Sequence, residues 1–166
     1  DEGLVHLSKL QNLELLDLTV ASTGPGVTDR GIAQIAKLRS LKELWLNGNG
    51  MDRVTDESLS ALADLPNLEV LLIKGPRITW DGLEHLSRFP KLSCLDLGKI
   101  QGDPITLRHL GALKRLKELR FGADCDSDAE LVHLAGLTRL ENLGLSGFPL
   151  TTAGMKHIGK LKSLQI

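Results

Sequence analysis

Apolar residues recur along the chain in the pattern LxxLxL, with variable residues between them. Copies begin at positions 13, 41, 68, 92, 116 and 140, and a truncated copy begins at 164. Successive copies start 28, 27, 24, 24, 24 and 24 residues apart. The alternation of apolar and variable residues within each copy predicts a short strand with one buried face. The chain is therefore predicted to consist of repeats.

Each predicted strand is followed by a turn and then by apolar residues three positions apart. Leu83, Leu86 and Phe89 form one such series. This spacing predicts a short amphipathic helix in every repeat. Each series is preceded by a side chain whose oxygen can accept a free backbone N–H, so we expect helix N-caps at Thr28, Thr55, Thr79, Asp103, Ser127 and Thr151.

One strand–turn–helix unit cannot bury its leucines alone, but stacked units can. We therefore expect an α/β solenoid in which parallel strands line a concave face and short helices cover the convex face. The chain resembles the leucine-rich-repeat family over essentially its whole length. The resemblance is to the class of roughly 24 residues per repeat, in which a Thr-Asp-x-Gly-Leu turn enters the helix, as in TDRGI at residues 28–32.

This class is similar to the F-box-associated repeats of eukaryotes and to repeats abundant in some bacteria. Helices such as GLEHL at residues 82–86 favour the bacterial kind. We expect one repeat domain over residues 1–166, with about six full repeats. Neither end resembles the capping unit that a solenoid needs to cover its terminal leucines, so we expect this domain to be part of a longer array.

The composition is that of an ordinary folded domain with an excess of leucine. The 166 residues include 36 Leu, 42% are hydrophobic, and the net charge is −1. Nucleic-acid-binding proteins usually carry a basic excess, and no apolar run approaches the roughly 18 residues of a membrane span. The two cysteines occupy different repeat slots, which argues against a disulfide and favours a reducing compartment such as the cytoplasm.

The variable residues of each strand are predicted to face away from the leucine core. Several of them are apolar in neighbouring repeats, and exposed apolar patches typically mark interaction sites. Trp is also enriched among residues that dominate binding energy. The predicted partner-binding residues on this face are Leu15, Asp17, Glu43, Trp45, Val70, Leu72, Cys94, Asp96, Glu118 and Arg120. The alternative interpretation is that a loop of this chain or a missing segment covers Trp45.

The two longest repeats carry extra residues after their strands, at positions 19–26 and 47–53. Insertions in a solenoid gather on one face, which is often the binding face. Trp80 stands at a predicted helix start near the same rim. We therefore expect both tryptophans to lie outside the repeat core, and Trp80 joins the predicted partner-binding residues.

The sequence contains no recognisable catalytic or metal-binding motif. Its five histidines occupy the same slot in their helices, and helices pack about 10 Å apart, which is too far for two of them to share a metal ion. Cys94 is expected to lie beside Asp96 and Glu118, whose charges would raise its pKa rather than activate its thiol. We predict no catalytic residue, no cofactor and no metal site.

The resemblance and the apolar patch together predict a non-enzymatic protein–protein interaction module that recognises a partner on its concave face. Trp45 and Leu72 would be its apolar anchors. We expect no nucleic-acid, membrane or small-molecule partner. Two alternatives stay open: the substrate-receptor part of a ubiquitin ligase or effector whose other domain lies elsewhere, and a structural spacer or self-associating array.

Overall fold

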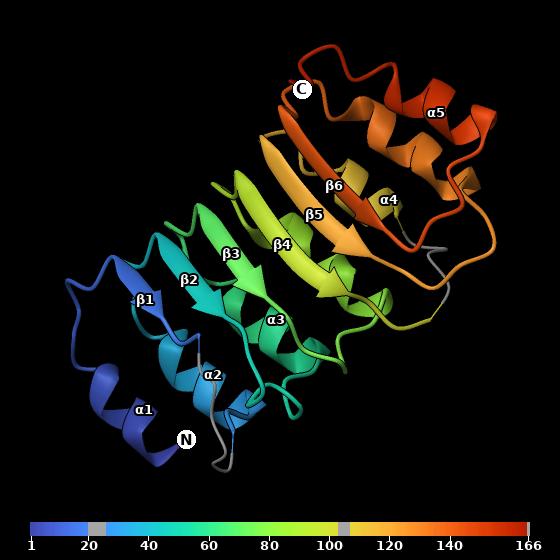
Figure 1. Ribbon diagram of the computed structural model, residues 1–166. Coiled ribbons are helices and arrows are strands. Elements are labelled where there is room, and N and C mark those ends of the chain that lie inside the picture. The colour runs from blue at the N-terminus through green and yellow to red at the C-terminus, as the bar shows by residue number, and fades with distance from the viewer. Residues whose placement is uncertain (20–25, 103–106, 166) are drawn as a thin grey trace.

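A computed structural model describes residues 1–19, 26–102 and 107–165. In these residues six strands form one parallel sheet, and they follow one another in sequence order (Figure 1). Each strand coincides with one LxxLxL copy, so the predicted strands are confirmed. They are β1 (Leu15–Asp17), β2 (Glu43–Leu46), β3 (Val70–Ile73), β4 (Cys94–Lys99), β5 (Glu118–Gly122) and β6 (Asn142–Ser146).

The helices lie on one side of the sheet and leave its other side uncovered (Figure 1). Two of them, η1 and η2, are 3-10 helices, in which side chains three residues apart lie one above the other. That geometry suits the three-residue spacing of Leu83 and Leu86 in η1. None of the helices of the described residues is long and apolar enough to span a membrane. The helices are α1 (Glu2–Leu7), α2 (Asp29–Ile35), α3 (Asp56–Leu62), η1 (Asp81–Arg88), α4 (Arg108–Gly111), η2 (Ala129–Gly136) and α5 (Thr152–Ile158).

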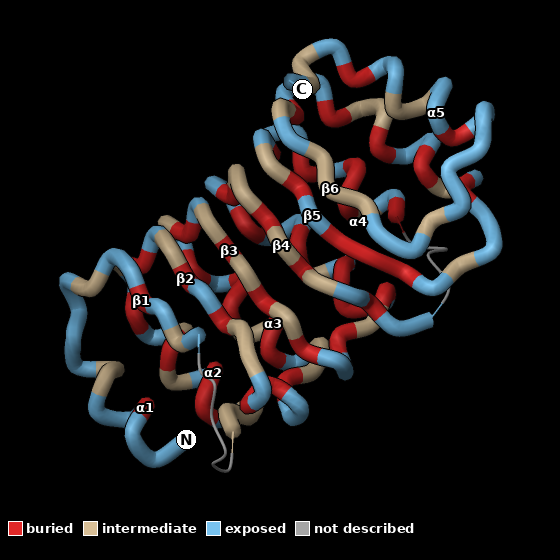
Figure 2. The backbone as a smooth tube through the Cα atoms, viewed as in Figure 1, coloured by how far each residue is buried: buried red, intermediate tan, exposed pale blue. Residues whose placement is uncertain are grey.

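The leucines of the repeat pattern fill the space between the sheet and the helices. Leu44, Leu71, Leu95 and Leu119 hold the same position in successive strands, and all four are fully buried. Their equivalent in β6, Leu143, is only partly buried. Figure 2 shows β6 in the colours of intermediate and exposed residues. An inner repeat is covered on both sides, whereas β6 has a neighbouring strand on one side only. The burial of a core leucine therefore depends on the repeats that lie next to it, as expected of an α/β solenoid.

Three of the predicted helix N-caps are confirmed. The hydroxyl oxygens of Thr28, Thr55 and Thr151 each accept a backbone N–H from the first turn of the helix that follows. The Ser127 hydroxyl accepts the N–H of Ala129 at 3.2 Å, just before η2. These bonds satisfy donors that a helix start otherwise leaves without a partner.

One predicted cap differs from this pattern. The residue that precedes η1 is Trp80 rather than Thr79, and it provides no side-chain cap. The Thr79 hydroxyl donates a hydrogen bond to Asp56 of the preceding repeat at 2.7 Å. The prediction of an N-cap at Thr79 was wrong, because η1 begins at Asp81, one residue later than the other helices do after their threonines. Asp103 lies outside the described residues.

In the part of the chain that the structure describes, a carboxylate from one repeat holds the helix start of the next repeat in four places. The aspartate accepts the backbone N–H and the hydroxyl of a threonine at distances between 2.6 and 3.1 Å. These paired bonds connect neighbouring repeats on the side of the helix starts, opposite the amino-terminal ends of the strands. The pairs are Asp1–Thr28, Asp29–Thr55, Asp56–Thr79 and Asp128–Thr151.

The second of the two long insertions, residues 47–53, contributes to the core. Met51 is fully buried among the core residues, although the sequence predicted this segment as part of the binding rim. Most of the first insertion, residues 20–25, lies outside the described residues.

Candidate functional site

The uncovered side of the sheet, called the open face below, carries two rows of side chains that run across all six strands. In one row Leu15 lies beside Glu43, which lies beside Val70; in the other, Asp17 lies beside Trp45. The predicted neighbours are therefore confirmed. The complete rows are Leu15, Glu43, Val70, Cys94, Glu118 and Asn142, and Asp17, Trp45, Leu72, Asp96, Arg120 and Gly144.

An apolar patch spans strands β1 to β4 on this face. The Leu15 side chain is 50% exposed and the Trp45 side chain 38% exposed. Val70, Leu72 and Cys94 are half-buried beside them. A large aromatic side chain held on a strand among other apolar groups presents rigid surface to solvent. This is the arrangement from which binding hot spots are built.

Two carboxylates flank the patch on β1 and β2. Asp17 accepts the backbone N–H of Thr19 at 2.8 Å, and hydrogen bonds from Thr19 lower the pKa of Asp17. Asp17 is exposed and Glu43 is half-buried. Among the described residues, neither carboxylate forms an ion pair. The β1–β2 side of the patch therefore has negative charge that no described cation balances.

The charged side chains toward β4 and β5 are paired. The Lys74 ammonium lies 3.1 Å from Asp96, and the Arg120 guanidinium lies 2.8 Å from Glu118. Asp96 also accepts the backbone N–H of Gly98 at 2.9 Å. Asp96 and Glu118 would gain less attraction from a cation on a binding partner, because each already lies beside a cation of this chain.

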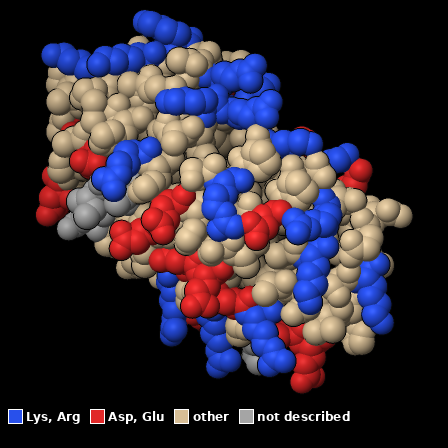
Figure 3. All heavy atoms as spheres, turned by 180° about the vertical axis from the view of Figure 1, so that it is seen from behind, with Lys and Arg blue, Asp and Glu red and all other residues tan. Residues whose placement is uncertain are grey.

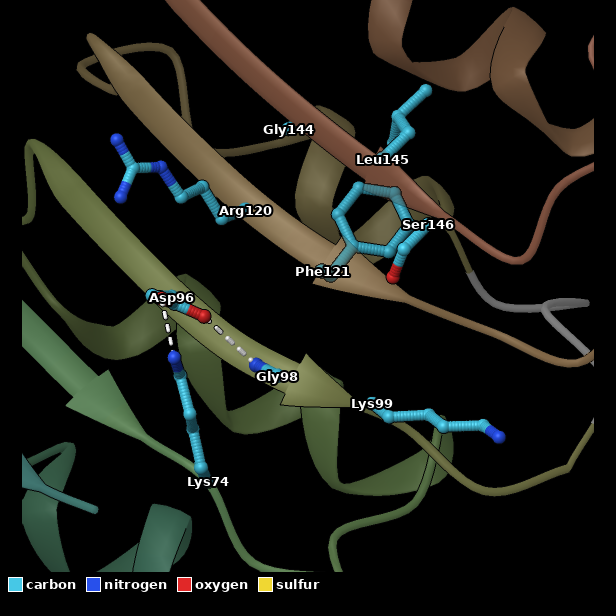
Figure 4. Close-up of a pocket in the computed structure, with 9 residues that line it drawn as sticks. All are labelled: Lys74, Asp96, Gly98, Lys99, Arg120, Phe121, Gly144, Leu145 and Ser146. Carbon is cyan, nitrogen blue, oxygen red and sulfur yellow. Dashed lines mark hydrogen bonds and ion pairs between the residues drawn. The ribbon is translucent and has the colours of Figure 1, made fainter. Parts of the chain in front are cut away.

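A hollow of about 350 Å³ lies among these paired charges (Figure 4). Glycines form part of it: Gly98 has a φ of +61°, and a Cβ at Gly144 would lie 3.0 Å from the Arg120 side chain. The sequence pattern did not predict this hollow. Its signal was the glycines at strand positions, which mark bulges and places where another group approaches the backbone closely. The lining residues are Lys74, Asp96, Gly98, Lys99, Arg120, Phe121, Gly144, Leu145 and Ser146.

The cysteine of the open face lies in surroundings that disfavour its thiolate form. Burial raises the pKa of Cys94 to about 11, and the negative charge of Glu118 adds to the rise. The predicted direction of the shift is confirmed, although Cys94 is half-buried rather than exposed. Cys94 and Cys125 form no disulfide with each other. A thiol that stays protonated at neutral pH is a poor nucleophile.

Trp80 does not belong to the open face. Its side chain is only 3% exposed and lies in the hydrophobic core. The indole N–H donates to the carbonyl oxygen of Gly102 at 2.7 Å, and the ring meets Phe121 edge-on at 5.9 Å between centroids. The prediction that both tryptophans lie outside the core was therefore wrong for Trp80. Phe121, two repeats further along the chain, provides the apolar surface that Trp80 packs against.

The histidines lie in the helices, away from the open face. His133 lies 3.5 Å from Glu130, and His85 lies 4.0 Å from Glu84, each within its own helix. Within the residues that the structure describes, no group of three His, Cys, Asp or Glu side chains could hold a metal ion.

Solved structures of similar fold include the following two. An internalin from Listeria monocytogenes matches with a TM-score of 0.61 and 24% identity, over 96% of this chain and 55% of that chain. Leiomodin-1 actin-binding site 2 matches with a TM-score of 0.55 and 16% identity, over 98% of this chain and 87% of that chain. This chain therefore spans about half the length of the internalin structure.

These similarities show the fold alone. Together with the six parallel strands, they establish an α/β leucine-rich-repeat solenoid, as the sequence predicted. No protein-family model matches the sequence, and no curated protein does.

Proposed function

We propose that this chain is a non-enzymatic protein-interaction module that recognises a partner through the apolar patch of its open face. The observation that carries the proposal is the position of Trp45, which is 38% exposed on a strand between Asp17 and Leu72. The second tryptophan, Trp80, is buried. Trp45 is therefore exposed because its strand position faces away from the core, and not because tryptophan is exposed throughout this fold.

The patch is preorganised for binding. Trp45 and Leu72 lie on neighbouring strands of a continuous hydrogen-bonded sheet, and the leucines of the same strands anchor them in the core. Binding of a partner would therefore cost little conformational entropy, because this surface is already ordered. Leu15 extends the apolar area toward β1.

The charges around the patch favour a partner of a particular kind. Asp17 and Glu43 are not ion-paired among the described residues, whereas Asp96 and Glu118 are. A partner that presents an apolar side chain to Trp45 and a Lys or Arg toward β1 would match both features. The hollow beside Arg120 would receive a further side chain of the partner.

Two other observations support this function. The Cys94 thiol, the most nucleophilic type of side chain on the open face, has a raised pKa of about 11 and is poorly suited to catalysis. The leiomodin-1 structure of similar fold is an actin-binding site, so a chain with this architecture serves a protein contact there. The identity of the partner of the present chain does not follow from that similarity.

The experiment is to capture proteins from a lysate of the source organism on the immobilised chain and to titrate each captured protein against variants. Trp45→Ala should weaken binding by about 30-fold, which corresponds to the ~2 kcal/mol of a hot-spot residue. Val132→Ala is the matched control, because Val132 is an exposed apolar residue of η2 with a 41% exposed side chain.

A partner that Trp45→Ala loses and Val132→Ala retains would support the proposal. Equal binding to both variants would place the contact elsewhere on the molecule and refute it. Asp17→Lys, tested in the same titration, should weaken a partner that presents a basic side chain toward β1, and unchanged affinity would reject that part of the proposal.

A further inference from the structure

A second hollow, of about 260 Å³, lies where β4 to β6 begin, at the edge of the sheet opposite the hollow described above. Four of its six lining residues are cations. Figure 3 shows Lys and Arg side chains gathered over the upper part of the molecule seen from behind, with most Asp and Glu side chains below them. We call this hollow the basic groove; it is lined by Glu69, Lys91, Ser93, Arg115, Lys117 and Arg139.

The cations come from three successive repeats. Lys91, Arg115 and Arg139 each stand one residue before an LxxLxL copy, at intervals of 24 residues. Neighbouring strands of a sheet lie about 4.8 Å apart, so these three side chains form a row about 10 Å long. Lys117 adds a fourth positive charge at the start of β5.

Most of this positive charge has no anionic partner. Lys91 donates to the side-chain oxygen of Asn67 at 2.6 Å, and Arg115 donates to the Pro90 carbonyl at 2.9 Å. These acceptors orient the cations but carry no net charge. Arg139 has neither a hydrogen bond nor an ion pair with any residue that the structure describes.

Two carboxylates lie close to the basic groove. Lys117 lies 3.4 Å from Glu141, and Glu69 is part of the lining. Four cations against these two carboxylates leave an excess of positive charge in a chain whose net charge is −1. Like charges held in one hollow repel each other, and a bound anion would relieve that repulsion.

We propose that the basic groove binds an acidic polypeptide segment, independently of the apolar patch. Charge complementarity selects an anion, and two arginines offer planar groups that can hold a carboxylate with two hydrogen bonds. The lining contains no aromatic residue on which a nucleic-acid base could stack, which favours a peptide over single-stranded nucleic acid.

The size of the groove limits the segment to a few residues. Alternate side chains of an extended peptide point the same way and lie about 7 Å apart. Two acidic residues at alternate positions would therefore both reach the row formed by Lys91, Arg115 and Arg139. The binding requires nothing from Trp45, so the two proposals succeed or fail separately.

The test is fluorescence anisotropy with a labelled oligoglutamate peptide at low ionic strength. The wild-type chain should bind it, and added salt should weaken the binding by screening. Arg139→Glu should lower the affinity about tenfold or more, as expected for the loss of a charge-assisted hydrogen bond and its replacement by repulsion. Arg139→Gln tests the loss of the cation alone and should give a smaller decrease.

Lys156→Glu is the matched control, because Lys156 is an exposed cation of α5 and the variant has the same net charge. Circular dichroism should show that all variants are folded. Equal loss of binding in Lys156→Glu would show general charge attraction and overturn the proposal, as would failure of the folded wild type to bind oligoglutamate. Tighter binding of labelled oligothymidine than of oligoglutamate would assign the groove to nucleic acid instead.

Discussion

The carboxylate of Asp29 accepts two hydrogen bonds from Thr55, one from its backbone N–H and one from its hydroxyl, both at 2.9 Å. The two residues belong to neighbouring repeats. The same Thr55 hydroxyl caps α3 by accepting the N–H of Glu57. One side chain therefore begins its own helix and joins that helix to the preceding repeat.

Replacement of Asp29 should destabilise the fold. Its carboxylate also accepts the hydroxyl hydrogen of Ser58, so Asp29→Ala removes the acceptor of three donors. We expect a decrease of about 2–3 kcal/mol in the free energy of unfolding, measured by urea denaturation. Glu57→Ala is the control, since Glu57 is also acidic and lies in a first helical turn, but its loss should cost at most about 1 kcal/mol. Equal effects would show that Asp29 acts only through the helix dipole.

A glycine in the first helical turn makes room for the aspartate of the preceding repeat. A Cβ at Gly82 would collide with the Asp56 carboxylate, whereas a Cβ at Gly3 would meet nothing. Gly82→Ala should therefore lower the free energy of unfolding by about 1–3 kcal/mol through overpacking. Its effect is measured by thermal or urea unfolding.

Gly3→Ala provides the internal comparison, because Gly3 holds the same place in the first described repeat. Ala is the better helix former by about 1 kcal/mol, so Gly3→Ala in α1 should leave stability unchanged or increase it slightly. If the two substitutions had the same effect, the glycine would not serve to accommodate the neighbouring carboxylate.

The Asp128–Thr151 contact should make the free energy of unfolding depend on pH. The hydrogen bond from the Thr151 backbone N–H is the largest cause that lowers the pKa of Asp128, and it outweighs the opposing effect of burial. Because the folded pKa is below the unfolded value of about 3.9, the contribution is complete above that value and is lost as pH falls through the folded pKa.

Asp128→Asn measures this contribution. The wild-type chain should be more stable than the variant near neutral pH, and the difference should shrink below about pH 4. Urea unfolding of both proteins across this range provides the comparison. A difference that stayed constant with pH would mean that ionisation of Asp128 does not stabilise the fold.

The Cys94 thiol should react slowly with alkylating reagents. Burial and the charge of Glu118 raise the pKa of Cys94 to about 11, so the rate should still increase above the pH of about 8.5 at which an ordinary thiol is half ionised. Glu118→Gln should shift the pH–rate curve toward lower pH. The measurement is the iodoacetamide rate in a Cys125→Ser background; a curve that levels off near pH 8.5 would contradict it.

The sequence by itself determined the repeat, the strands and the two rows of the open face. Each of these depends on local periodicity: alternate residues of a strand face opposite sides wherever the strand lies. The neighbours Asp17, Trp45 and Leu72 could therefore be named from repeat alignment alone, as the register confirms. The N-caps at Thr28 and Thr55 were equally local, because a cap contacts its own helix.

Only the tertiary structure decided which side-chain contacts join one repeat to another. Trp80 is buried because Phe121 and the Gly102 carbonyl meet its ring, and no local pattern around Trp80 shows those partners. The Thr79 hydroxyl bonds to Asp56 for the same reason. Stacking fixes the offset between successive helices, and this offset determines which carboxylate reaches which threonine. It also brings the cations that line the basic groove together from separate repeats.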